Sequence, residues 1–188
     1  MTLYLHLDRM GQLKQNDIIG LQRYAGGNAL SAFADMFCMD FIRHLDGLCY
    51  KGLSYHGKSY LIGHFDPGHS FRADLIMNEL YLEFTRWKNG IDAPSRLQSL
   101  FAWRDKEDAL KSAQDNKAYP MIYEVEALGR FVECDMNLSR RPDCALQYWQ
   151  GKALCNDESY SLMCECVLEL PVRVVRQVKL TPAFSFAE

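Results

Sequence analysis

The chain has 188 residues, of which 48% are hydrophobic and 24% charged, a composition typical of one globular domain. The formal net charge is −3, and lysine and arginine do not gather in one run. This argues against a protein that binds nucleic acid through its overall charge, although it does not exclude a local basic patch. No apolar run reaches the roughly 18 residues of a membrane span, and Met1–Met10 lacks the regions of a secretory signal. We therefore expect a protein of the cytosol, or one delivered into another cell's cytosol, with no membrane partner.

The seven cysteines are odd in number and irregularly spaced, which favours reduced thiols over a disulfide framework. Cys164 and Cys166 point the same way on a predicted strand, but no second pair of ligands stands at zinc spacing. His56, His64 and His69 share one long loop, and we interpret them as solvated side chains. The sequence therefore predicts no metal site.

The N-terminal part of the chain predicts a strand followed by a helix. Alternation over Leu3–Leu7 predicts the strand, with Tyr4 and His6 on the face opposite the leucines. Apolar residues at helical spacing predict a helix from Asn28 or Ser31 to about Leu45.

The next stretch, residues 47–70, is rich in glycine, tyrosine and histidine. It predicts a loop with one short strand at most, and loops of this length often carry function. A second helix is expected from Ser70 or Arg72 to about Lys88, where Asn89 and Gly90 end it.

The segment Pro94–Leu110 combines a short apolar run with the beginning of a helix. The run predicts a buried strand that carries Ser99, and Asp105 is the expected N-cap of a helix that ends near Asn116. A strand that leads directly into a capped helix would hold the Ser99 hydroxyl rigidly at the floor of a cleft.

The remaining chain is mostly strand. Strands are expected over Tyr119–Ala127 and Phe131–Met136, followed by a short helix that begins after Ser139 and Pro142. Two further strands within 160–180 meet at Leu170-Pro171, and about residues 181–188 are expected to form a loose tail. A strand, then helices, then mostly strands predicts an α+β domain with a mixed or antiparallel sheet, because regular βαβ alternation is missing.

Glu165 stands out among the acidic residues because apolar side chains flank it on both sides. A carboxylate in such a run faces either water at a sheet edge or a pocket, where its protonation affects function. Glu124 and Glu126, by contrast, share one strand face that we expect to be solvated. The chain contains no P-loop, GxGxxG, HExxH or GxSxG motif, so the sequence gives no support to the four large enzyme classes that these motifs mark.

Three patches, supported by Tyr148–Gly151, together resemble one family. They are Tyr4–Arg9, Pro94–Ala102 and Glu165–Val175. In this order they resemble the ADP-ribosyltransferase superfamily, above all a group of small bacterial members. The resemblance implies a single domain over residues 1–188, with split mixed or antiparallel β-sheets and flanking helices. It also implies NAD as the substrate and no metal.

The resemblance further implies roles for individual residues. Glu165 would be the catalytic carboxylate, and Ser99 would hydrogen-bond this glutamate and the ribose. His6 or Arg9 would contact the ribose or the diphosphate, and Arg96 is a further candidate for the diphosphate. The rings that could enclose nicotinamide are those of Tyr60, Phe65, Phe71 and Phe101.

The function expected from this resemblance is mono-ADP-ribosylation of an acceptor, in the first instance a protein, by a bacterial effector, a toxin or a phage-borne modifier. Met163 occupies a position that helps choose the acceptor in arginine-modifying members, so the resemblance does not define the acceptor. One alternative is a non-catalytic module that binds a nucleotide or a protein on the same fold. Another is a small enzyme that uses cysteine and histidine.

Overall fold

The computed structural model describes residues 2–23, 35–61, 73–114, 121–152 and 160–178, which form an α+β fold. The described α-helices are α1 (Met39–Lys51), α2 (Tyr55–Leu61), α3 (Ala73–Lys88), α4 (Lys106–Gln114) and α5 (Ala145–Trp149). No helix in these ranges is long and apolar enough to cross a membrane.

The strands form two antiparallel sheets. The four-stranded sheet has the order β1 (Leu3–Asp8), β4 (Met121–Ala127), β7 (Val172–Val178) and β2 (Ile18–Ile19). The three-stranded sheet has the order β3 (Ser99–Ala102), β6 (Cys164–Glu169) and β5 (Phe131–Asp135). A single bridge joins them, in which Leu5 and Trp103 exchange backbone hydrogen bonds of 2.7 and 2.8 Å.

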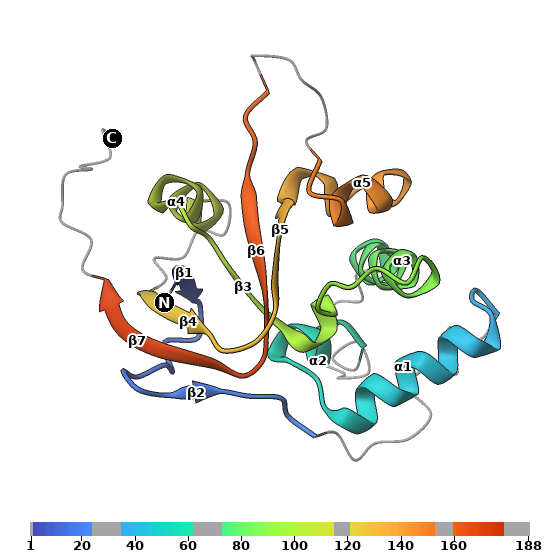
Figure 1. Cartoon of the computed structure of the whole chain (residues 1–188), viewed down its shortest axis with the longest axis horizontal. Helices are drawn as coiled ribbons and strands as arrows, with labels where there is room; N and C mark the ends of the chain where they lie inside the picture. Colours follow the sequence, from blue (N-terminus) through green and yellow to red (C-terminus); the bar gives the residue numbers. More distant parts are fainter. Residues whose placement is uncertain (1, 24–34, 62–72, 115–120, 153–159, 179–188) are drawn as a thin grey trace.

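The two sheets pack face to face, and helices cover the far side of the three-stranded sheet (Figure 1). Between the sheets lies an apolar core that includes Tyr4, Ala102, Val125, Cys166 and Val174. Helices α1, α2, α3 and α5 lie on the opposite side of β3-β6-β5, while α4 packs against β1. Alternate residues of β6 therefore point either into the core between the sheets or towards the helices.

Several predicted elements are confirmed. Oδ1 of Asp105 accepts a hydrogen bond of 2.6 Å from the backbone N–H of Glu107, so Asp105 caps α4 as expected. β6 and β7 are separated at Leu170-Pro171, where the chain passes from one sheet to the other. The expected α+β class with antiparallel pairing is confirmed as well.

Two expectations about the first helices are wrong. α1 begins at Met39 and continues past Leu45 to Lys51, where Gly52 with a φ of 113° ends it. The predicted loop 47–70 contains α2, which is stabilised by contacts distant in the sequence: Ser54 donates from its N–H and its hydroxyl to the Leu97 carbonyl, at 2.9 and 3.1 Å.

The predicted buried strand of the Pro94–Leu110 segment begins later than expected. A 3-10 turn, η3 (Arg96–Gln98), precedes β3, so Leu97 belongs to the turn and not to the strand. The expected helix starts at Asn28, Ser31, Ser70 and Arg72, and the expected tail 181–188, lie outside the described residues.

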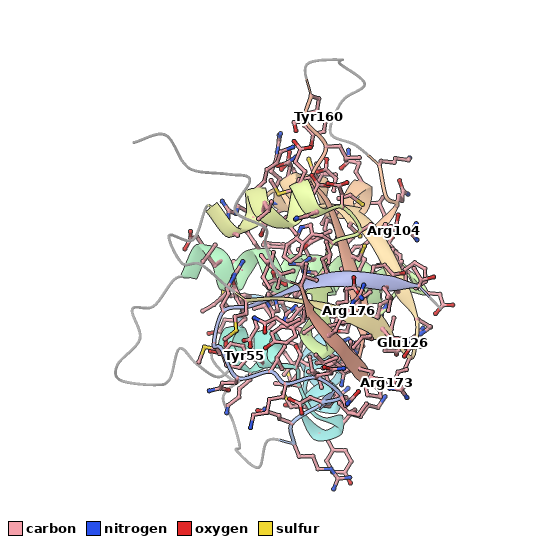
Figure 2. The ribbon with its side chains drawn as sticks, turned by 90° about the vertical axis from the view of Figure 1, so that its left-hand side faces the viewer. Tyr55, Arg104, Glu126, Tyr160, Arg173 and Arg176 are labelled. Atoms are coloured by element: carbon pink, nitrogen blue, oxygen red, sulfur yellow. The ribbon has the colours of Figure 1, made fainter. Side chains whose placement is uncertain are left out.

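Exposed ion pairs line the outer part of the four-stranded sheet (Figure 2). Nε of Arg176 lies 2.6 Å from Oε2 of Glu124, and Nη1 of Arg173 lies 3.3 Å from Oε2 of Glu126. The expectation that both glutamates lie on a solvated face is confirmed, and such pairs contribute little to stability.

Candidate functional site

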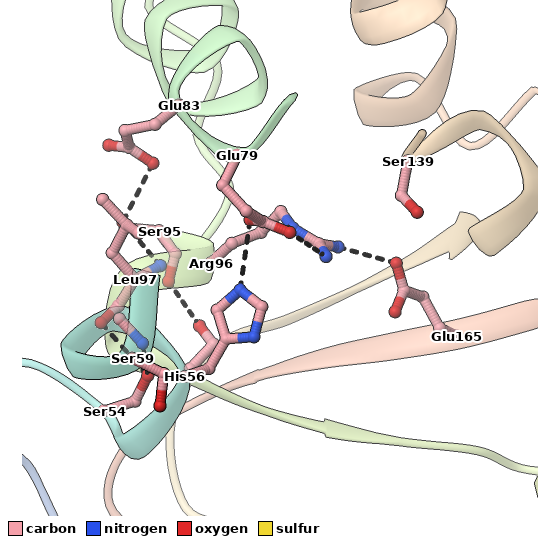
Figure 3. A network of polar contacts seen from close by, with 12 residues as sticks. Ser54, His56, Ser59, Glu79, Glu83, Ser95, Arg96, Leu97, Ser139 and Glu165 are labelled. Carbon is pink, nitrogen blue, oxygen red and sulfur yellow. Dashed lines mark hydrogen bonds and ion pairs between the residues drawn. The ribbon is translucent and has the colours of Figure 1, made fainter. Parts of the chain in front are cut away.

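Arg96 is the centre of a buried group of polar side chains, shown from close by in Figure 3. Nε and Nη2 of Arg96 donate to the two carboxylate oxygens of Glu79, both at 2.9 Å. Nη1 donates to Oε1 of Glu165 at 2.6 Å and also contacts the hydroxyl of Tyr148. We call Arg96, Glu79, Glu165, Tyr148 and the neighbouring His56 the Arg96 cluster.

Each member of the Arg96 cluster comes from a different element. Arg96 begins η3, Glu79 lies on α3, Glu165 on β6, Tyr148 on α5 and His56 on α2. The cluster thus fills the space between the three-stranded sheet and the helices that cover it. It forms only when all of these elements are packed.

Local sequence explains how η3 holds Arg96. Ser95 caps the turn, because its hydroxyl accepts a hydrogen bond of 3.3 Å from the N–H of Leu97. The same hydroxyl donates to Oε2 of Glu83 at 2.9 Å, and Glu83 is completely buried. The residue before Arg96 is therefore tied to α3 by a charge-assisted hydrogen bond.

Gly57 allows α2 to lie directly against η3. A Cβ atom at this position would stand 2.1 Å from the carbonyl oxygen of Leu97, closer than any side chain permits. This close approach places His56 beside Glu79, with Nε2 of the ring 3.2 Å from Oε2 of the carboxylate.

The electrostatics of the cluster follow from burial and opposite charges. Burial alone raises the pKa of Glu79, but Arg96 and, to a smaller extent, the neighbouring His56 outweigh it and hold this pKa well below its ordinary value. Burial also lowers the pKa of Arg96, yet Glu165 and Glu79 raise it well above the usual value. Arg96 is therefore a permanent cation that ties the carboxylate of Glu79 to that of Glu165.

Tyr148 acts as a donor in this cluster. Burial raises the pKa of its phenol well above the usual value, so the hydroxyl keeps its proton. It donates to Oε1 of Glu165 at 2.8 Å, the same oxygen that Arg96 binds. The two hydrogen bonds that Glu165 receives from these residues thus fix the orientation of its carboxylate.

Aromatic rings border the cluster on one side. The guanidinium carbon of Arg96 lies 4.4 Å from the ring centre of Phe101. The ring of His56 lies 4.6 Å from that of Phe101 and 4.5 Å from that of Tyr60. Nδ1 of His6 lies 2.8 Å from the carbonyl oxygen of Phe101, and burial lowers the pKa of this histidine.

Most of the residues expected at the site come together around Phe101: Glu165, Arg96, Tyr60, His6 and Phe101 itself. Arg9 follows directly after β1 and is exposed, but its charge acts on His6 and Tyr60, so it lies near the same place.

Ser99 does not meet Glu165. It pairs with Glu169, four residues further along β6 than Glu165, which corresponds to roughly 13 Å of strand. Its hydroxyl donates to the carbonyl of Ser95 at 2.7 Å and so stabilises the turn before β3. The contact that the resemblance implies is therefore not formed. Phe65 and Phe71 lie outside the described residues.

Arg96 has partners other than those expected. Its guanidinium is 5% exposed and bound by two carboxylates and a hydroxyl, so a diphosphate would have to displace them. Its geometry is that of a residue that holds buried carboxylates in place, rather than that of a free contact for an anion.

Three members of the cluster were not assigned from the sequence: Glu79, Tyr148 and His56. A weak signal existed for Glu79, because it lies among the buried residues Ile76 and Leu80 on the inner face of α3. Tyr148 was noted only within Tyr148–Gly151, as support for the resemblance. The interpretation of His56 as a solvated loop residue is wrong, because it lies on α2 with its side chain 20% exposed and next to Glu79.

The described residues contain no group of three or more histidine, cysteine or acidic side chains that could hold a metal ion. Comparison with known proteins gives no matching family model and no matching curated protein. The function of the chain has to be inferred from the geometry of the Arg96 cluster and its surroundings.

Proposed function

We propose that the protein is an NAD-dependent mono-ADP-ribosyltransferase, which cleaves the nicotinamide–ribose bond and transfers ADP-ribose to an acceptor, in the first instance a protein. The proposal rests on one observation: residues from distant parts of the chain come together at Phe101. His6 binds its carbonyl, Arg96 lies over its ring, and Arg96 in turn binds Glu165. Each of the three patches that resemble the superfamily thus contributes a residue to one place.

The architecture also supports the proposal. The resemblance implies split sheets with flanking helices, and the two antiparallel sheets here are joined at the single bridge between Leu5 and Trp103. His6 lies one residue after Leu5 and therefore stands where the two sheets meet. Through the Phe101 carbonyl, His6 is connected to the edge of β3 next to the Arg96 cluster.

Glu165 would carry the chemistry. Cleavage of the nicotinamide–ribose bond passes through an oxocarbenium-like state, which a nearby carboxylate stabilises. Arg96 and Tyr148 both donate to Oε1 and orient the group, so Oε2 is the oxygen assigned to the ribose. His6 donates from Nδ1 to the Phe101 carbonyl, which leaves Nε2 to accept from a ribose hydroxyl.

One observation favours a second candidate, a non-catalytic binding module on the same fold. Glu165 is only 3% exposed and already has two donors, as in a purely structural ion pair. A module of this kind would bind NAD or a protein partner without breaking the glycosidic bond.

The test compares the wild type with Glu165→Gln in the presence of labelled NAD and a cell lysate. We expect NAD to raise the melting temperature of both proteins. Only the wild type should release nicotinamide and label an acceptor. Glu169→Gln is the matched control, because Glu169 lies on the same strand and pairs with the exposed Arg130.

The outcomes separate the candidates. Wild-type activity in Glu165→Gln would contradict the assignment of this carboxylate. A shift of the melting temperature without any nicotinamide release from the wild type would favour the binding module.

A further inference from the structure

Helix α3 carries two buried glutamates one turn apart, and each of them contacts one histidine and one arginine. Glu83 contacts His44 at 2.8 Å and Arg86 at 2.5 Å. Glu79 contacts His56 at 3.2 Å and binds Arg96 through both oxygens. The chain thus contains two similar histidine–glutamate pairs, and their surroundings show which of them can act on a ligand.

The first pair lies where α1 packs on α3, and its histidine, 19% exposed, contacts aromatic rings other than that of Phe101. The ring of His44 stacks on Phe41 and Trp87, with centres 5.9 and 5.7 Å apart, in the apolar core of α1 and α3. The carboxylate of its partner Glu83 already forms hydrogen bonds with His44, Arg86 and Ser95. This pair stabilises the packing of α1 on α3.

The second pair belongs to the Arg96 cluster. The ring of His56 contacts Phe101, the residue around which the NAD site is proposed. The side chain of His56 is 20% exposed, against 9% for Glu79 and 5% for Arg96. Of these three ionisable groups, His56 is therefore the one most accessible to a second substrate that enters from solvent.

Resting on the proposed function, we propose that His56 is a further catalytic residue, the base that takes the proton from a hydroxyl acceptor, with Glu79 as its positioning residue. Glu79 is ionised and lies 3.2 Å from Nε2 of the imidazole; as a base, His56 would keep its proton on Nε2, facing this carboxylate, and carry the lone pair on Nδ1. Tyr60 and Phe101 hold the ring from the sides.

The step balances without any further reactant. The acceptor oxygen forms a bond to the anomeric carbon of the ribose, while the bond from that carbon to nicotinamide breaks. The electron pair of the broken bond leaves with nicotinamide, which becomes neutral, and the hydroxyl proton moves to Nδ1 of His56. The imidazolium, stabilised by Glu79, then releases this proton to water.

A base at this position fits a hydroxyl acceptor and does not fit a carboxylate. A carboxylate acceptor is already ionised near neutral pH and gains nothing from a histidine. A hydroxyl keeps its proton and must lose it during transfer. The bond formed to the acceptor is therefore expected to be an O-glycoside, which neutral hydroxylamine leaves intact, and not an ester, which hydroxylamine cleaves.

The experiment measures ADP-ribose transfer from labelled NAD to lysate acceptors by the wild type, Glu165→Gln, His56→Ala and His44→Ala. His56→Ala is expected to bind NAD, to transfer at least about 100-fold more slowly, and to recover part of its rate when imidazole is added. His44→Ala is the matched control: it should lose thermal stability, and imidazole should not restore any activity that it loses.

The two proposals fail differently. If the wild type releases no nicotinamide from NAD, the proposed function is overturned and the role of His56 with it. If the wild type is active and Glu165→Gln is not, but His56→Ala stays within about threefold of the wild type or is not rescued by imidazole, only the role of His56 is overturned. A hydroxylamine-labile product would also overturn it.

Discussion

The hydroxyl of Ser95 donates a hydrogen bond of 2.9 Å to the completely buried carboxylate of Glu83. The same hydroxyl accepts from the N–H of Leu97 and caps η3. One small side chain thus connects α3 to the turn that holds Arg96. The consequences of losing such contacts can be measured one residue at a time.

Ser95→Ala should lower the free energy of unfolding by about 1–3 kcal/mol, because a buried carboxylate loses a donor and a turn loses its cap. Urea denaturation measures the change. Ser59→Ala is the control, since the exposed Ser59 hydroxyl only donates to the Tyr55 carbonyl one turn earlier. It should change stability by less than about 0.5 kcal/mol, and equal effects of both substitutions would contradict the role of Ser95.

Gly57→Ala should destabilise the protein by about 1–3 kcal/mol, because the new methyl group would collide with the Leu97 carbonyl and force α2 away from η3. Thermal unfolding followed by circular dichroism measures this effect. Gly47→Ala is the matched control: Gly47 lies inside α1 with no atom within 4 Å of an added Cβ. There alanine should be neutral or stabilising by up to about 1 kcal/mol, and a neutral Gly57→Ala would disprove the tight contact.

Arg96→Met should cost about 3–5 kcal/mol of stability, because Glu79 and Glu165 would remain buried without their cation. Arg176→Met is the comparison, since it removes an exposed pair with Glu124 that contributes little to stability. Chemical denaturation of both variants measures the difference. A similar small loss in both would mean that the Arg96 cluster is solvated.

Acid should destabilise the protein in two steps. Burial lowers the pKa of His6 below its ordinary value of 6.5, so the unfolded chain binds this proton first. The stability that depends on neutral His6 is complete above pH 6.5 and is lost as the pH falls below it. Burial opposes ionisation of Glu79, but Arg96 and His56 lower its pKa well below 4.5. That contribution is complete above about pH 4.5 and is lost at lower pH.

Denaturation curves at a series of pH values test this behaviour. His6→Asn should remove the upper step and leave the lower one, because asparagine does not titrate. An unchanged upper step in this variant would assign it to a different group.

The sequence predicted the elements whose signals are local. Asp105 marked the start of α4, and Leu170-Pro171 marked the boundary between β6 and β7. Helix α2 was missed because it has only seven residues and depends on hydrogen bonds from Ser54 to Leu97, 43 residues away. Short helices of this kind form through tertiary contacts rather than through propensity.

Of the candidate site, the sequence predicted one important residue, Glu165, but not the residues that contact it. Glu165 could be singled out because a carboxylate within an apolar strand needs partners. The identity of those partners could not be read, because Arg96 is 69 residues away and Tyr148 lies on another helix. For Ser99 the prediction was wrong. Its hydroxyl donates to the Ser95 carbonyl in the adjacent turn and does not contact Glu165.

The spacing of Glu79 and Glu83 limits how this region can change in length. Each residue inserted into or deleted from a helix turns the following residues by about 100°. One insertion between these two glutamates would therefore rotate either Glu79 away from His56 and Arg96 or Glu83 away from His44, and a compensating change elsewhere could not restore both. The segment after Lys88 is limited in length as well, because Nη1 of Arg86 donates to the carbonyl of the buried Ala93 at 3.1 Å.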